Sequence, residues 1–170
     1  MADKVKMVLV EVPEGLAEAV KKFVLEVEES APSADGGRAV DFAKYEDAVE
    51  EAAAKLEREA IRRVLQRFDI DTRRVVIGGK AYTRVGRYEG SYKTKAGPVT
   101  VLRSLYREDG RRNGKTVDPV SVRVGAVEDG WLPGTARAMS FQLQNGTSRE
   151  AEAAMGEAGR LKYSRSSFES

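Results

Sequence analysis

Apolar residues recur at helical spacing in two stretches of the first seventy residues. The first stretch follows Pro13 and runs to about Ser30, with apolar positions at Leu16, Val20, Phe23, Val24 and Val27. The second runs from about Phe42 to Phe68, with a stripe of Tyr45, Val49, Ala52, Leu56, Ala60, Val64 and Phe68. Spacings of three and four place these groups on one face of a helix. The pattern predicts two amphipathic helices joined by a Pro- and Gly-containing linker at 31–37, and a short strand at 5–12 before them.

From Thr72 the apolar spacing changes to one typical of strands. Alternating and β-branched residues predict strands at 74–77, 81–87, 91–94 and 99–107, with glycine-containing turns between them. Within 99–107 the odd-numbered residues share one face and the even-numbered residues the other. A turn at 108–114 leads to a short return strand near 115–117. The middle of the chain is therefore predicted to be a small antiparallel meander.

From about Val120 the pattern becomes helical again. A helix at 135–144 is expected to end at Asn145-Gly146, and Thr147 with Glu150 forms a capping box for the next helix. A third, short helix is expected after Ser164. This order is typical of a helix-turn-helix unit, and equally of any small helical hairpin.

These patterns together predict an α+β protein with three regions. They are an N-terminal helical region at 1–70, a basic antiparallel β-meander at 71–118, and a C-terminal helical, helix-turn-helix-like unit at 119–170.

The composition argues against catalysis. The 170 residues include no cysteine and no histidine, so disulfides, thiolate ligands and the commonest general base are absent. Asp69, Asp71, Glu108 and Asp109 fall in turns or at helix ends, whereas two-metal chemistry needs carboxylates that converge from separate strands. We therefore expect no enzyme activity, no cofactor and no metal site.

No stretch of the chain has the apolar character of a signal peptide or a membrane span. We therefore expect a cytoplasmic protein that does not associate with membranes.

Charge is distributed unevenly along the chain. The net charge of +2 is made of −7 over residues 1–60, +10 over 61–127 and −1 over 128–170. A basic middle segment is typical of a protein that contacts phosphate, and it also fits a surface whose acidic and basic halves pair with one another. The arginines in the last turns of the predicted long helix also have two interpretations: they complement the helix dipole, or they contact phosphate. These residues are Arg58, Arg62, Arg63 and Arg67.

Cations and tyrosines alternate in the predicted meander. Such cations gain binding energy from counterion release at phosphate, and the tyrosines can stack or donate hydrogen bonds. We expect the cations to gather on one exposed surface; the alternative is a twisted sheet that needs charged edges and aromatic pairs. The candidate DNA-binding residues, including one at the start of the last short helix, are Arg84, Arg87, Lys93, Lys95, Arg103, Arg107, Arg111, Arg112, Lys115 and Arg165.

Three segments in order resemble the amino-terminal region of ISKra-type insertion-sequence transposases: 82–108, 117–141 and 147–170. In the first, the hairpin residues that match are Tyr92, Thr94, Gly97, Pro98, Val99, Tyr106 and Arg107. In the other two, the matches are Pro119, Gly125, Thr147, Arg149, Glu150, Ala151, Ser164, Ser166 and Ser167. The resemblance covers roughly residues 45 to 170.

The resemblance implies a DNA-binding role at the ends of a mobile element. Members of that family continue into an RNase-H-like domain whose carboxylate triad binds two metal ions, and this sequence stops before such a domain, so no catalytic residue is implied here. The resulting hypothesis is a truncated, non-catalytic transposase-like protein. Its expected partners are double-stranded DNA and a catalytic transposase subunit supplied by another chain. The competing hypothesis is a protein-interaction module in which the acidic N-terminal helices form a homodimer with no nucleic-acid role.

Overall fold

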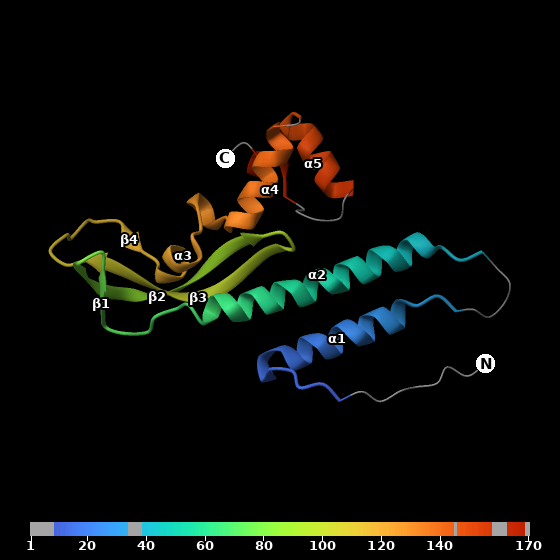
Figure 1. Cartoon of the computed structure of the whole chain (residues 1–170), viewed down its shortest axis with the longest axis horizontal. Coiled ribbons are helices and arrows are strands. Elements are labelled where there is room, and N and C mark those ends of the chain that lie inside the picture. The colour runs from blue at the N-terminus through green and yellow to red at the C-terminus, as the bar shows by residue number, and fades with distance from the viewer. Residues whose placement is uncertain (1–8, 34–38, 145, 158–162, 169–170) are drawn as a thin grey trace.

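The computed structural model describes residues 9–33, 39–144, 146–157 and 163–168 of the chain (Figure 1). Two N-terminal helices, α1 (Glu14–Ser30) and α2 (Phe42–Gln66), precede a four-stranded antiparallel sheet. The strands are β1 (Arg74–Ile77), β2 (Lys80–Thr94), β3 (Gly97–Glu108) and β4 (Thr116–Val117). The chain continues through α3 (Pro119–Val124), a short 3₁₀ turn η1 (Glu128–Gly130), α4 (Pro133–Gln144), α5 (Ser148–Glu157) and α6 (Arg165–Phe168). The predicted α+β class is confirmed.

The two N-terminal helices form an antiparallel hairpin that extends away from the sheet (Figure 1). Both lie where the apolar spacing predicted them, but α1 has no buried residue and α2 has only Ala52 and Leu65. The predicted strand at 5–12 is wrong for residues 9–12, which have no regular secondary structure, while 5–8 lie outside the described residues. Leu9 is 92% exposed. A segment rich in β-branched residues forms a strand only where another strand pairs with it, so this pattern did not produce a strand here.

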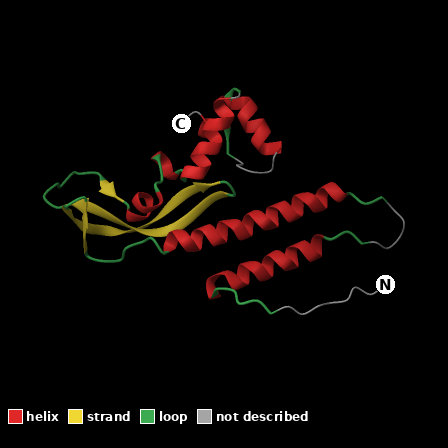
Figure 2. Cartoon of the chain, in the orientation of Figure 1, coloured by secondary structure: helices red, strands yellow, loops and turns green. Residues whose placement is uncertain are grey.

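The sheet has the strand order β1-β2-β3-β4, with each neighbouring pair antiparallel (Figure 2). The predicted strands at 81–87 and 91–94 are one continuous strand, β2, so Gly86 and Gly90 do not mark turns. A Cβ at Gly86 would overlap the Tyr88 ring, and one at Gly90 would overlap the Arg103 side chain. These glycines therefore make room for neighbouring side chains that lie across the strand.

The buried face of β3 changes halfway along the strand. Val99 and Val101 are buried in the first half, whereas Ser104 and Tyr106 are buried in the second. The first half packs against α2 and α3. The second half packs against the connection from α2 to β1, where the Tyr106 hydroxyl lies 2.6 Å from the carbonyl oxygen of Ile70. Strict alternation was predicted, but the covering segment decides which set of residues is buried.

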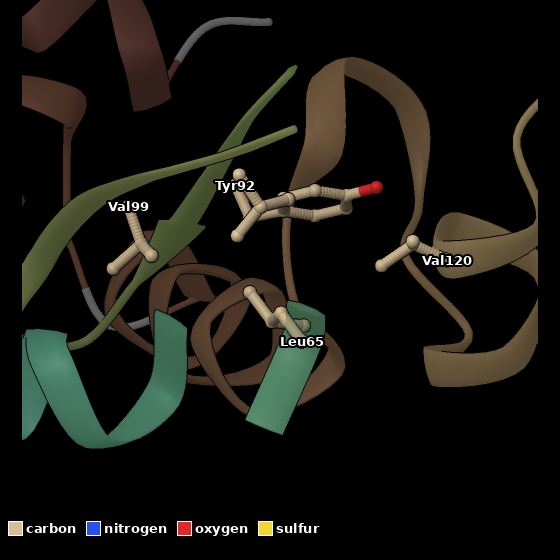
Figure 3. Packing of buried hydrophobic residues seen from close by; sticks show 5 residues of the cluster. Leu65, Tyr92, Val99 and Val120 are labelled. Carbon is tan, nitrogen blue, oxygen red and sulfur yellow. The ribbon is translucent and has the colours of Figure 1, made fainter. Parts of the chain in front are cut away.

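The main core lies where the sheet meets α2 and α3. It consists of Leu65, Tyr92, Val99, Val101 and Val120, each no more than 3% exposed. The Tyr92 side chain extends from β2, with Leu65 of α2 and Val120 of α3 beside it (Figure 3). Burial of these apolar groups from three elements fixes the sheet against the helices.

The end of α2 also covers part of the open edge of β3. The Gln66 side-chain amide donates to the Leu102 carbonyl at 2.8 Å, and the Ser104 backbone N–H donates to Asp69 Oδ1 at 2.8 Å. Strand β4 pairs only with Tyr106 and Arg107 of β3. The side chains of Gln66 and Asp69 therefore serve as hydrogen-bond partners for the adjacent part of the β3 edge. Satisfying edge groups in this way opposes pairing with other chains.

The C-terminal helices have a small core of their own, formed by Trp131, Met139, Ala151 and Met155. The predicted capping box is present, since the Thr147 and Glu150 side chains each accept a hydrogen bond from the other's backbone N–H, at 3.3 and 2.7 Å. The Tyr163 hydroxyl donates to the Thr94 carbonyl at 2.7 Å and ties this region to the end of β2. Within the described ranges, no helix combines the length and apolarity needed to cross a bilayer.

Candidate nucleic-acid interface

Two of the predicted DNA-binding arginines are paired with aspartates from the connection between α2 and β1. Arg87 contacts Asp69 at 3.0 Å and Asp71 at 3.4 Å, and Arg84 pairs with Asp71. The Asp69 side chain is only 4% exposed and also accepts hydrogen bonds from Ser104. The charges of both arginines are therefore offset within the protein, and both arginines hold this connection to the sheet.

Arg103 is part of a polar network that joins β2, β3 and α3. Its side chain lies across Gly90, pairs with Asp118 and approaches the Tyr92 hydroxyl at 3.4 Å. Asp118 is the N-cap of α3, where it accepts the Val120 backbone N–H at 2.9 Å and is also 2.7 Å from the Ser121 hydroxyl. The side chains of Arg103 and Asp118 are 25% and 9% exposed. This arginine therefore has a structural role.

The protonation of this network follows from burial and hydrogen bonding. Burial, together with the hydrogen bond to Asp118, raises the pKa of Tyr92 to about 12. Burial alone would raise the pKa of Asp118, but hydrogen bonds from Tyr92 and Ser121 and the Arg103 charge lower it below its usual value. Tyr92 is thus a neutral donor and Asp118 an ionised acceptor at neutral pH.

Three other candidates lie away from these arginines. The Lys93 ammonium lies 4.4 Å from the centre of the Trp131 ring, a cation–π contact. Lys95 is exposed in the turn between β2 and β3. Arg165 begins α6, but its side chain lies outside the described part of the structure.

A hollow of about 410 Å³ lies next to the turn that follows β3, at the end of the sheet opposite to Lys95. A register shift between Arg84 and Gly86 marks a β-bulge on its β2 side, and bulges re-aim the side chains beside them. Four arginines therefore surround one small space. The residues that line it are Thr83, Arg84, Val85, Arg107, Glu108, Asp109, Gly110, Arg111 and Arg112.

The two carboxylates at this hollow already have partners. Asp109 pairs with Arg74 and accepts a hydrogen bond from Thr83 at 2.7 Å, while Glu108 lies 3.2 Å from Lys80 and 3.4 Å from Arg111. The pKa of Asp109 is lowered by these hydrogen bonds, first from Thr83 and then from Arg74. Both acidic side chains are thus engaged by cations at the rim.

The remaining cations at this end have no such partner. Arg107 donates to the Arg112 carbonyl at 3.2 Å, has a buried Nε without a hydrogen-bond partner, and forms no ion pair with any described carboxylate. Arg112 and Lys115 are exposed and likewise unpaired among the residues that the structure describes. We define the turn-end basic cluster as Arg107, Arg111, Arg112 and Lys115.

The structure therefore divides the predicted set of cations. The predicted cations do not form one cluster, because Arg87 and Arg103 pair with Asp69 and Asp118, and Lys95 and Arg112 lie at opposite ends of the twelve-residue strand β3, about 40 Å long. Asp69, Asp71 and Asp118, which pair with the arginines of the strands, were not among the predicted site residues. Asp69 and Asp71 were predicted to be turn residues. Their position two residues apart, shortly before arginine-rich strands, was the one sequence feature that indicated ion pairs with those arginines.

Comparisons with protein-family models, with curated proteins and with solved structures find no match for this chain. The resemblance to ISKra-type transposases stays a prediction. Several of the hairpin residues that carry it are core residues of this fold, since Tyr92, Thr94, Val99 and Tyr106 are each no more than 3% exposed.

Proposed function

We propose that the turn-end basic cluster of this chain binds the backbone phosphates of double-stranded DNA and that the chain does not cleave the DNA. The observation that carries the proposal is that Arg107, Arg112 and Lys115 have no carboxylate partner among the described residues, and that Arg107 and Arg112 line the 410 Å³ hollow. An unpaired cation binds phosphate and releases counterions without first breaking an internal ion pair. The strand arginines Arg87 and Arg103 would have to break such pairs.

The chemistry of the cluster suits phosphate. A guanidinium presents a planar set of donors that matches phosphate oxygens. Phosphate contacts set position and affinity but do not by themselves read sequence. We therefore expect binding that differs little between duplex sequences, and mobile-element ends are the duplexes that the transposase resemblance indicates.

The test is a fluorescence polarisation titration of a labelled duplex with the full chain over a range of salt concentrations. The variant Arg112→Ala/Lys115→Ala removes two exposed charges that form no ion pair with any described residue. The matched control Lys21→Ala/Arg137→Ala removes one exposed lysine and one exposed arginine outside the turn-end basic cluster. Arg87 and Arg103 are left intact because their removal would disturb the fold.

The logarithm of the binding constant should fall steeply with the logarithm of salt concentration. Each phosphate contact contributes roughly 0.9 to this slope, so the cluster variant should reduce it by about 1.8 and weaken binding, while the control leaves both unchanged. Binding that is insensitive to salt, absence of binding at low salt, or equal effects of the two variants would contradict the proposal.

A further inference from the structure

The helical hairpin leaves its apolar side chains incompletely covered. Four apolar side chains of α1 that recur at helical spacing are each only half-buried: Leu16, Val20, Phe23 and Val27. A groove of about 350 Å³ runs between the two helices, lined in its centre by Ala19, Phe23, Ala52 and Leu56. A 3.0 Å ion pair between Glu26 and Lys55 lies at its side. The groove covers residues 15–26 of α1 and 52–59 of α2, and it combines these apolar groups with the charged side chains of Glu18, Lys22 and Glu59.

Two helices alone cannot enclose a core. In helical proteins most of the stability comes from packing an apolar face against further elements, and four helices are the usual solution for long antiparallel pairs. The sheet does not provide that cover, because it packs against the end of α2 at Leu65 and not against α1. The groove therefore has room for a partner that also consists of paired helices.

Charge along the hairpin identifies the partner. The half near the connection between the helices, residues 23–30 and 42–54, carries seven carboxylates and one lysine. The half near the sheet, residues 14–22 and 55–67, carries seven cations and four carboxylates, and three of these cations, Lys55, Arg58 and Arg62, pair with Glu26, Glu51 and Glu59 within the hairpin. The hairpin is therefore acidic at one end and basic at the other.

We propose that a second copy of this chain packs antiparallel on the hairpin, groove against groove, to form a four-helix bundle. In that arrangement the acidic half of each copy faces the basic half of the other, whereas a parallel arrangement would place like charges together. Both copies use the same surface, as a two-fold axis requires. The proposal does not depend on DNA binding.

The arrangement has a geometric consequence. α2 has 25 residues and is about 37 Å long. Because each sheet lies at the C-terminal end of its α2, antiparallel packing places the two sheets at opposite ends of the bundle. The two turn-end basic clusters would then be far apart, on separate ends of the dimer.

The test uses charge reversal in the full-length chain, with mass measured by light scattering after size exclusion. Variant A is Glu46→Lys/Asp47→Lys, which reverses exposed charges in the acidic half. Variant B is Arg63→Glu/Arg67→Glu, which reverses charges in the basic half. The control Arg111→Glu/Arg112→Glu makes the same change as variant B on the sheet, away from the hairpin.

The wild type should have twice the 18.6 kDa mass of one chain. Variants A and B should each dissociate at protein concentrations at least ten times higher than the wild type does, and an equimolar mixture should recover the dimer. The control should remain dimeric. Recovery in the mixture shows that both variants fold, since a misfolded variant could not complement its partner.

Three results would overturn the proposal. The first is a wild type that stays at 18.6 kDa throughout the concentration range. The second is a mixture of A and B that remains monomeric, and the third is a control variant that dissociates as readily as A or B.

Discussion

The helical hairpin and the β2–β3 hairpin are both long antiparallel pairs with clear periodic patterns, but they differ in burial. In the β-hairpin Tyr92, Val99 and Val101 are no more than 3% exposed, whereas no residue of α1 reaches that burial. The β-hairpin is contacted by α2, by α3 and by the connection to β1, while α1 packs mainly against α2. An amphipathic pattern therefore specifies a face, and the number of neighbours decides how completely that face is covered.

The comparison predicts that the stability of the monomer resides around the sheet. Leu65→Ala should lower the free energy of unfolding by about 3 kcal/mol, because Leu65 is 3% exposed and its removal leaves a cavity among Tyr92, Val99 and Val120. The neighbouring Val64 is 48% exposed, and Val64→Ala should change the same quantity by less than about 0.5 kcal/mol. Urea unfolding followed by circular dichroism measures both, and similar values for the two would contradict the assignment of the core.

The polar network beneath α3 should have the next largest effect. Asp118→Ala removes both the N-cap of α3 and the partner of Arg103, and should lower the free energy of unfolding by about 2 kcal/mol. Because the pKa of Asp118 is lowered in the folded protein, its contribution is present above the pKa of an unfolded aspartate and is lost as the pH falls through the folded value. Acid unfolding of the variant should therefore depend less on pH than that of the wild type, and an unchanged profile would be inconsistent with an ionised Asp118.

At alkaline pH the same network predicts a loss of stability through Tyr92. Its folded pKa of about 12 exceeds the value near 10 of an unfolded tyrosine, so the stabilisation is complete below pH 10 and declines as the pH rises toward 12. The free energy of unfolding should fall by about 1–2 kcal/mol over this window. Tyr92→Phe should reduce the decline, and Tyr163→Phe should reduce it further, since burial also raises the pKa of Tyr163 to about 12. A decline that neither substitution alters would exclude these hydroxyls as its source.

Substitution of Gly90, which lies within β2, should lower the stability of the protein. Gly90→Ala would force the Arg103 side chain away from its position across β2, at a cost of about 1 kcal/mol. Gly156 in α5 has no atom within 4 Å of a Cβ built on it, so Gly156→Ala should stabilise the protein by about 0.5 kcal/mol. Thermal unfolding of the two variants checks the opposite signs, and a neutral Gly90→Ala would show that Arg103 has room to move.

A small effect is also expected in the first helix of the helical hairpin. Leu25→Ala makes the same chemical change as Leu65→Ala, but Leu25 is 48% exposed on α1. The substitution should lower the free energy of unfolding by about 0.5 kcal/mol, since little apolar surface is removed from water at this position. Urea titration of the two leucine variants side by side tests the comparison directly. Equal losses would show that the hairpin contains a core as well protected as that of the sheet.

Much of the local structure follows from the sequence. The period of the apolar residues predicted both long helices, and the predicted capping box of Thr147 with Glu150 was also correct. These features depend on residues within a few positions of one another, so the information lies in adjacent sequence. Among the candidate site residues, the sequence named Arg107, Arg111 and Arg112, which line one hollow, and Lys115, which precedes the Thr116 that pairs with Arg107.

The tertiary structure alone decided which cations are free. Arg87 pairs with Asp69 eighteen positions away and Arg103 with Asp118 fifteen positions away, through contacts that no local pattern contains. The same holds for the switch of buried face along β3, which depends on where the connection after α2 crosses the sheet. A cation's chemistry is fixed by its side chain, but its available charge depends on the carboxylates that folding brings within reach. The sequence therefore determined the elements and the positions of the cations, and the fold separated structural arginines from those exposed to a polyanion.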